Sequence, residues 1–206
     1  AAIAIALLCL AWGLWKGQGL QIGDSQTGVP ELRPDSRYNQ DSALISESFG
    51  LGQDLLRVVF ETETDGCVNY KVVKAIEDFS WKMRNHLDVQ LVISLPQLMV
   101  WANAGWNEGD PRFKTLPNNP QLLARNSRIV PTSAGLNNVD CSLMPVNIFL
   151  KDHRATTIQS VIAEIENWKV SQKDLDTLPL KLHLAAGNVG IMAATNEVIA
   201  AEEKPI

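Results

Sequence analysis

The same order of strand, helix and strand occurs twice in the chain, and this repetition limits the fold more than any other feature. The first copy has apolar runs at residues 55–60 (LLRVVF) and 89–93 (VQLVI), and the second has them at 146–150 (VNIFL) and 180–184 (LKLHL). Short apolar runs of this length are typical of β-strands. The second strand begins 34 residues after the first in both copies, at 89 after 55 and at 180 after 146. The equal spacing indicates two copies of one structural unit, with a coincidence between two common βαβ units as the alternative.

A segment with helical periodicity lies between the two strands of each copy. A connection of this kind crosses over right-handedly and places its helix on one face of the sheet. We therefore predict an α+β protein made of two ferredoxin-like βαβ units, at residues 53–94 and 145–186. The apolar helical positions are Val72, Ile76, Phe79 and Met83 within residues 68–86, and Ile158, Val161, Ile162, Ile165 and Trp168 within residues 156–169.

A helical insertion, residues 95–144, separates the two predicted units. Its first helix carries Leu95, Leu98, Met99, Ala102 and Trp106 at helical spacing, and a second short helix is predicted in QLLARNSRIV, residues 121–130. Trp101 lies off the apolar stripe of the first helix, so that helix has apolar residues on two faces. Such a helix needs two partners, which are either the two flanking units or one unit and a ligand.

The chain closes with a predicted helix at residues 188–204. Gly187, Gly190, Ala193 and Ala194 give this helix a face of small residues. A face of this kind lets another backbone approach closely.

The first 15 residues, AAIAIALLCLAWGLW, contain no charged side chain. Trp12 and Trp15 end this run and Lys16 follows it, an order typical of a membrane boundary. A spanning helix needs about 20 apolar residues, and we interpret residues 1–15 as the end of a transmembrane helix. A signal-peptide remnant and an apolar helix buried in the domain are the alternatives. Residues 16–52 are rich in Gly, Pro, Ser, Asp and Asn and are predicted to be a connector.

The composition excludes several classes of protein. Of the 206 residues, 46% are apolar and 20% are charged, which is typical of a folded globular domain and excludes intrinsic disorder. Eighteen basic and 23 acidic side chains give a net charge of −5 without long runs of either sign. Nucleic acid, which requires a concentrated basic face, is therefore not expected as a partner.

Motifs that carry catalysis are missing from the sequence. No two of His86, His153 and His183 stand at a metal-ligand spacing, and we predict no metal site. There is no G-x-S-x-G elbow and no P-loop, and GNVG lacks the third glycine of a dinucleotide site. We therefore expect neither an enzyme nor a bound cofactor. Asp152 or Thr156 is expected to cap the helix that follows them.

Longer blocks of the sequence resemble a known family. After the apolar run come GLQIGDSQTGVPELRPDSRYNQD, the first βαβ pattern, DCSLMPVNIFLKDHRATTI and AAGNVGIMAATNEVI. This order resembles the second large extracytoplasmic loop of RND-superfamily exporters, and in particular the MMPL-like or patched-like branch that includes hopanoid and sterol exporters. The similarity covers nearly the whole chain, and PELRPDSRYN and GNVGIMAATNEV are its most specific blocks.

The resemblance implies a place and a function for the chain. Residues 1–15 would end a transmembrane helix in the bacterial inner membrane, and residues 53–206 would form a periplasmic porter domain. The implied activity is proton-driven export of hydrophobic molecules, with lipids such as sterols or hopanoids as substrates. The implied partners are the rest of the transporter, namely its transmembrane helices and first periplasmic loop, and a periplasmic carrier protein. Proton-relay residues of this superfamily lie in transmembrane helices, so none is assigned here. The alternative is a membrane-anchored periplasmic lipid-binding or scaffold module without transport.

The helical insertion supplies the side chains expected to bind such a hydrophobe. A lipid cleft needs wide apolar walls and one or two polar groups that orient a headgroup. Aromatic and Met side chains suit flat or irregular hydrophobes, because they combine a large contact area with an adaptable shape. The alternative is that these residues only form core. The candidate ligand-binding residues are Leu98, Met99, Trp101, Asn103, Trp106, Phe113, Leu122 and Ile129, with Asn107 nearby.

Two of the three cysteines are expected to form a disulfide. Cys67 follows the first strand and Cys141 precedes the third, so pairing of these strands would bring the two thiols together. The periplasm implied by the resemblance is oxidising and would join them. Cys9 lies in the apolar run and is expected to be free, and two unpaired buried thiols at positions 67 and 141 are the alternative.

Overall fold

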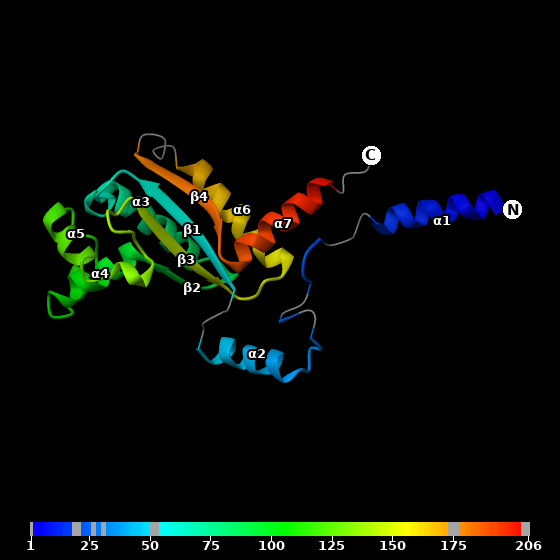
Figure 1. Ribbon diagram of the computed structural model, residues 1–206, viewed down its shortest axis with the longest axis horizontal. Helices are drawn as coiled ribbons and strands as arrows, with labels where there is room; N and C mark the ends of the chain where they lie inside the picture. The colour runs from blue at the N-terminus through cyan, green and yellow to red at the C-terminus, as the bar shows by residue number, and fades with distance from the viewer. Residues whose placement is uncertain are drawn as a thin grey trace.

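Four strands pair into one antiparallel sheet in the order β2-β3-β1-β4 (Figure 1). The computed structural model describes residues 2–17, 22–25, 28–29, 32–49, 54–172 and 178–202. Each strand is antiparallel to its neighbours, so β1 and β2 run parallel with β3 between them, and β3 and β4 run parallel with β1 between them. The two predicted strand pairs therefore interleave in a single sheet, and the predicted α+β class is confirmed. The strands are β1 (Leu55–Thr62), β2 (Val89–Ser94), β3 (Leu143–Leu150) and β4 (Leu180–Ala186).

The two central strands present alternate side chains to a buried face. Leu56, Val58 and Phe60 of β1 are buried, while the residues between them are only partly covered. The register places Leu56 opposite Ile148 and Val58 opposite Val146, which are buried on the same side of β3. Strict alternation of this kind is what a half-buried antiparallel strand requires.

Helices α3 (Tyr70–Arg84) and α6 (Ala155–Ser171) contribute to the core beside these strands. The side chain of Asn69 caps α3 by accepting hydrogen bonds from the backbone N–H groups of Lys71 and Val72. An aromatic cluster of Phe60, Phe79 and Trp168 joins β1 to both helices. Its rings meet edge to face, with centroids 4.9 to 6.2 Å apart.

The start of α6 corrects one expectation. The capping position is Arg154, whose side chain makes no capping hydrogen bond, and Thr156 lies exposed inside the helix. Asp152 instead accepts a hydrogen bond from the backbone N–H of Arg154 at 3.1 Å, before the helix begins. A carboxylate two residues from its donor closes an Asx turn, so it orients the loop without capping the helix.

The helical insertion extends from one end of the sheet (Figure 1). It begins with α4 (Leu95–Gly105), which follows β2 without a loop and has Pro96 as its second residue, and it continues with α5 (Pro120–Ser127). The helices contact each other, and α5 also contacts the 3₁₀ turn Gly66–Val68 that follows β1. A disulfide joins Cys67 of that turn to Cys141, with the two Cα atoms 5.5 Å apart, while Cys9 is free and exposed. The structure therefore confirms the predicted disulfide between Cys67 and Cys141.

The C-terminal helix α7 (Asn188–Glu202) packs on β1, β4 and α6. Gly187 precedes it with φ +91°, and a Cβ atom at this position would lie 2.4 Å from the carbonyl oxygen of Leu55. This is the close backbone approach expected from the small residues. Gly190 is buried and Ala193 packs against the core, but Ala194 is exposed and takes no part in that contact.

The segment predicted as a connector contains a helix, α2 (Arg37–Phe49). Ser36 supports its start, because the Ser36 hydroxyl accepts from the backbone N–H of Asn39. Asn39 is the only buried residue of α2. The sequence prediction missed this helix because a helix that buries almost nothing carries no apolar stripe.

The N-terminal run forms helix α1 (Ala2–Gly17). Side chains at positions 2–13, 15 and 16 are exposed, which argues against the alternative of a helix buried in the domain. Trp12 and Trp15 meet edge to face, and the Lys16 ammonium lies within 6 Å of both rings. Among the described residues, no helix combines the length and apolar character that crossing a membrane requires.

Candidate functional site

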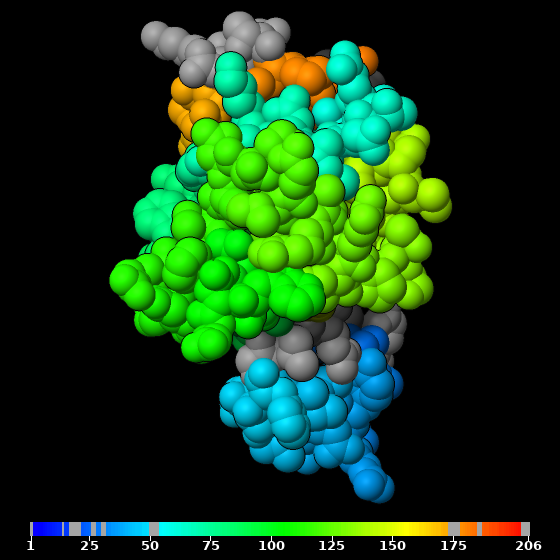
Figure 2. All heavy atoms as spheres, turned by 90° about the vertical axis from the view of Figure 1, so that its left-hand side faces the viewer, coloured from blue at the N-terminus to red at the C-terminus, as the bar shows by residue number. Residues whose placement is uncertain are grey.

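The helical insertion presents large apolar side chains to solvent. Figure 2 views the molecule from this side, with the insertion in green at the front. Isolated exposed hydrophobes are ordinary, whereas several on one small element indicate a contact surface. We call the exposed set the insertion surface; its members are Trp101, Trp106, Phe113, Leu122 and Ile129.

Three of the residues predicted to bind ligand lie elsewhere. Met99 is fully buried in the core, and Leu98 is partly buried against it. Asn103 is also buried, and its side-chain amide donates to the carbonyl oxygens of Phe113 and Thr115 at 2.8 and 3.2 Å. These residues support the insertion from inside and are not among its exposed side chains. The sequence placed them with the others because helical spacing alone does not say which apolar face points outward.

An open pocket of about 500 Å³ lies between the end of α4 and the outer face of α5. It brings together Trp106 and Ile129 of the predicted set, whereas Trp101, Phe113 and Leu122 lie outside it. The guanidinium of Arg125 lies over the Trp106 ring, 5.2 Å from its centroid. We call this hollow the Trp106 pocket; its lining is Trp106, Gln121, Ala124, Arg125, Arg128 and Ile129.

The local sequence explains why α5 presents these side chains. Asn119 caps the helix by accepting from the N–H groups of Gln121 and Leu122, and Pro120 occupies its first position. Leu123 and Asn126 point inward and are buried. Positions 121, 125 and 128 therefore share the opposite, solvent-facing side. The sequence prediction did not include these polar positions, because it considered the apolar walls of a cleft.

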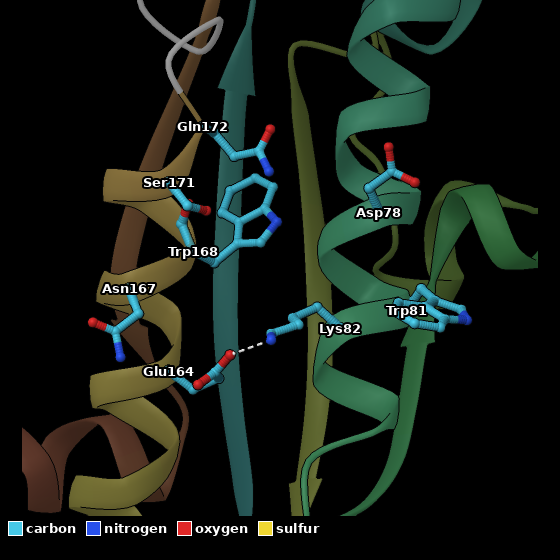
Figure 3. A pocket seen from close by; sticks show the side chains of 8 residues that line it. All are labelled: Asp78, Trp81, Lys82, Glu164, Asn167, Trp168, Ser171 and Gln172. Atoms are coloured by element: carbon cyan, nitrogen blue, oxygen red, sulfur yellow. Dashed lines mark hydrogen bonds and ion pairs between the residues drawn. The ribbon is translucent and has the colours of Figure 1, made fainter.

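A second hollow, of about 620 Å³, lies between α3 and α6 (Figure 3). An ion pair between Lys82 and Glu164, with N and O atoms 2.9 Å apart, crosses it. Most of its lining is polar, and Trp168 at its floor belongs to the aromatic core. Trp81 and Trp168 are the only apolar side chains among the described residues of its lining, whereas half of the residues that line the Trp106 pocket are apolar, so this hollow suits a hydrophobic ligand less well. Its lining is Asp78, Trp81, Lys82, Glu164, Asn167, Trp168, Ser171 and Gln172.

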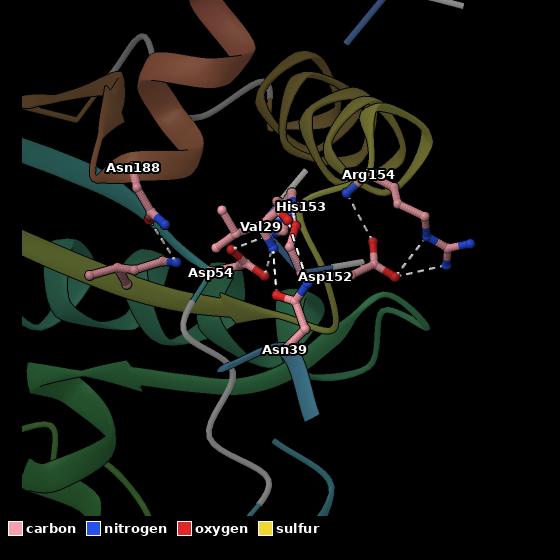
Figure 4. Close-up of polar contacts among 9 residues, drawn as sticks. Val29, Asn39, Asp54, Asp152, His153, Arg154 and Asn188 are labelled. Atoms are coloured by element: carbon pink, nitrogen blue, oxygen red, sulfur yellow. Dashed lines mark hydrogen bonds and ion pairs between the residues drawn. The ribbon is translucent and has the colours of Figure 1, made fainter. Parts of the chain in front are cut away.

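His153 connects three separate segments at the far end of the sheet (Figure 4). Its Nδ1 lies 3.2 Å from both carboxylate oxygens of Asp54, just before β1, and its Nε2 lies 2.8 Å from the carbonyl oxygen of Gly28. Both ring nitrogens thus face acceptors, and only the imidazolium can donate from both. Asn39 of α2 holds the same segment by accepting from the backbone N–H of Val29.

The pKa values of His153 and Asp152 are shifted from their ordinary values. The hydrogen bond to Asp54 raises the pKa of His153, against the opposing effect of burial. Burial disfavours the charged form of Asp152, but hydrogen bonds from Arg154 and Thr157 outweigh it and lower the pKa of this carboxyl group. Both shifts favour the charged forms, which suits a structural polar network.

His153 should make the stability of the protein depend on pH. Because its pKa is raised in the folded state, its contribution is fully present below the unfolded value of about 6.5 and is lost as the pH rises through the folded pKa. We expect the difference in unfolding free energy between wild type and His153→Gln to shrink over that window. Denaturant titrations from about pH 5.5 to about pH 8.5 measure it. His86→Gln is the control, because Nδ1 of His86 accepts a backbone N–H from Asp88. A constant difference across this range would contradict the assignment.

Comparison with known proteins adds no assignment. No protein-family model matches the chain, and no curated protein matches it significantly. Within the described ranges, no group of three or more His, Cys, Asp or Glu residues could hold a metal ion. A function for this chain therefore rests on its residues, their geometry and the sequence resemblance to RND exporters.

Proposed function

We propose that this chain is the periplasmic substrate-binding porter domain of a proton-driven RND exporter in the bacterial inner membrane. In this proposal the exporter moves hydrophobic molecules, with lipids such as sterols or hopanoids as substrates. The observation that carries it is the insertion surface, where five large apolar side chains are exposed on one helical arm. Exposed apolar surfaces of this kind are typical of binding sites.

The sheet supports the same proposal. Its order, β4-β1-β3-β2 when read from the other edge, fits two interleaved βαβ halves in a ferredoxin-like arrangement. The face of the sheet opposite α3 and α6 carries the partly buried Val59, Ile93 and Phe149. A partly apolar face of this kind suits packing against the rest of a transporter. The implied mechanism is a mechanical one, in which such subdomains rock to open and close a path for an apolar molecule.

The alternative is a membrane-anchored periplasmic lipid-binding or scaffold module without transport. Helix α1 supports this alternative, because an exposed apolar helix that ends in Trp12, Trp15 and Lys16 would suit an anchor. The two proposals differ in the number of membrane segments in the full-length protein, since an exporter needs many and an anchored module needs one. Hydropathy of the complete gene product separates them.

Substitution of Trp106 tests the proposed binding site. We expect Trp106→Ala to weaken, roughly tenfold, the binding of the sterol, hopanoid or fatty acid that the chain takes up, because truncation removes a large flat contact. Trp81→Ala is the matched control, since Trp81 is 60% exposed and Trp106 is 55% exposed, but Trp81 lines the polar hollow. Binding is followed by thermal unfolding and intrinsic fluorescence with a sterol, a hopanoid and a fatty acid. Equal losses in the two variants would contradict the site.

A further inference from the structure

We infer that the Trp106 pocket binds an anionic amphiphile, with the acidic headgroup between Arg125 and Arg128 and the apolar part on Trp106 and Ile129. This inference rests on the proposed function, because it names the chemical class of the hydrophobe. A carboxylate and a phosphate headgroup share the required chemistry, since a guanidinium can donate two parallel hydrogen bonds to either.

The two arginines of the Trp106 pocket differ from three other arginines in their ion pairs. Arg84, Arg112 and Arg154 each form an ion pair with a nearby carboxylate. In the part of the chain that the structure describes, no ion pair joins Arg125 or Arg128 to an acidic side chain. Two guanidinium groups thus stand in one pocket with their charge uncompensated by protein. An acidic headgroup would supply the missing partner.

The insertion differs from the whole chain in its net charge. The whole chain carries a net charge of −5, yet the insertion, residues 95–144, contains four basic and three acidic side chains and so carries a net charge of +1. One of the three acidic side chains, Asp110, is paired with Arg112. The insertion is therefore a locally positive element on a negative protein, which complements an anion.

The Trp106 pocket also has an apolar half. Trp106 and Ile129 are exposed beside the two arginines, and Arg125 lies over the Trp106 ring. A guanidinium stacked on an indole has one face covered, while its N–H donors in the ring plane stay accessible to an acceptor. A simple inorganic anion would leave the apolar residues unused, and a neutral hydrophobe would leave the charges unused. An amphiphile uses both.

The test compares ligands that differ only in the headgroup. The 206-residue chain is titrated with decanoate, decyl phosphate and decanol below their aggregation limits, and with inorganic phosphate. We expect decanoate or decyl phosphate to bind roughly tenfold more tightly than decanol, because a charge-assisted hydrogen bond is added. The acidic ligand that binds more tightly, decanoate or decyl phosphate, identifies the headgroup as a carboxylate or a phosphate.

Two double variants locate the effect. Arg125→Gln with Arg128→Gln should remove the preference for the acidic ligands and leave decanol binding unchanged. Arg112→Gln with Lys114→Gln removes the same charge from the same insertion and should keep the preference, which controls for the general field. Circular dichroism checks that both variants fold.

Three outcomes would overturn this inference. Equal affinity for decanol and the acidic ligands would overturn the anionic amphiphile and leave the proposed hydrophobe binding intact. Phosphate binding as tight as decyl phosphate would indicate a plain anion site and also overturn it. No saturable binding of any decyl compound would overturn this inference, and a sterol or hopanoid that still binds would show that the proposed function survives.

Discussion

Replacing both Cys67 and Cys141 by alanine is expected to lower the free energy of unfolding by roughly 4 kcal/mol. The bond closes a loop with a sequence separation of 74, which contains α3, β2, α4 and α5. Opening it gives the unfolded chain more conformations, and the loss grows with loop length. The side chains of both cysteines are buried, so the variant also loses some packing. Denaturant titration of the variant and wild type, both without reductant, measures the difference.

Two controls make this prediction specific. Cys9→Ala should leave the stability unchanged within about 0.5 kcal/mol, because Cys9 is exposed on α1 and unpaired. Alkylation of unreduced wild type should modify Cys9 alone, as peptide mass analysis would reveal. Labelling of Cys67 and Cys141 in the folded, unreduced protein would contradict the disulfide.

Truncation of Phe79 is expected to cost about 3 to 5 kcal/mol of stability. Phe79 is fully buried, and its ring meets Phe60 and Trp168 edge to face, so Phe79→Ala leaves a cavity where α3, α6 and β1 join. Phe113→Ala is the matched control and should cost less than about 1 kcal/mol, because Phe113 is 41% exposed on the insertion. Equal losses in the two variants would show that the aromatic cluster is not the centre of the core.

Much of the secondary structure was predictable because it follows local patterns. Leu56, Val58 and Phe60 alternate as a half-buried strand must, and the apolar positions of α3 recur at helical spacing. The order of the strands was not predictable in this way. β1 pairs with β3, whose residues lie about 90 positions away, and no local pattern says which strands become neighbours. Helix α2 escaped prediction because its residues hardly enter the core.

The candidate site was predictable only in its apolar half. Trp106 and Ile129 stood out as large hydrophobes of the insertion, and the structure places both in one pocket. Met99 looked the same in sequence, yet the turn of α4 directs it into the core. Arg125 and Arg128 gave no signal by themselves, because exposed arginines are common on any surface. Their proposed role depends on two features of the folded chain. Neither arginine forms an ion pair with an acidic side chain among the described residues, and the indole of Trp106 lies beside Arg125.

Titration of the unmodified chain with a sterol, a hopanoid and a fatty acid tests the central claim most directly. The chain contains six tryptophans, and two of them lie on the insertion surface, so a bound hydrophobe should change the intrinsic fluorescence. We predict a saturable change in the micromolar range with at least one of the three ligands, together with a higher midpoint of thermal unfolding. The absence of a saturable change with all three would contradict the claim that this domain binds hydrophobic molecules.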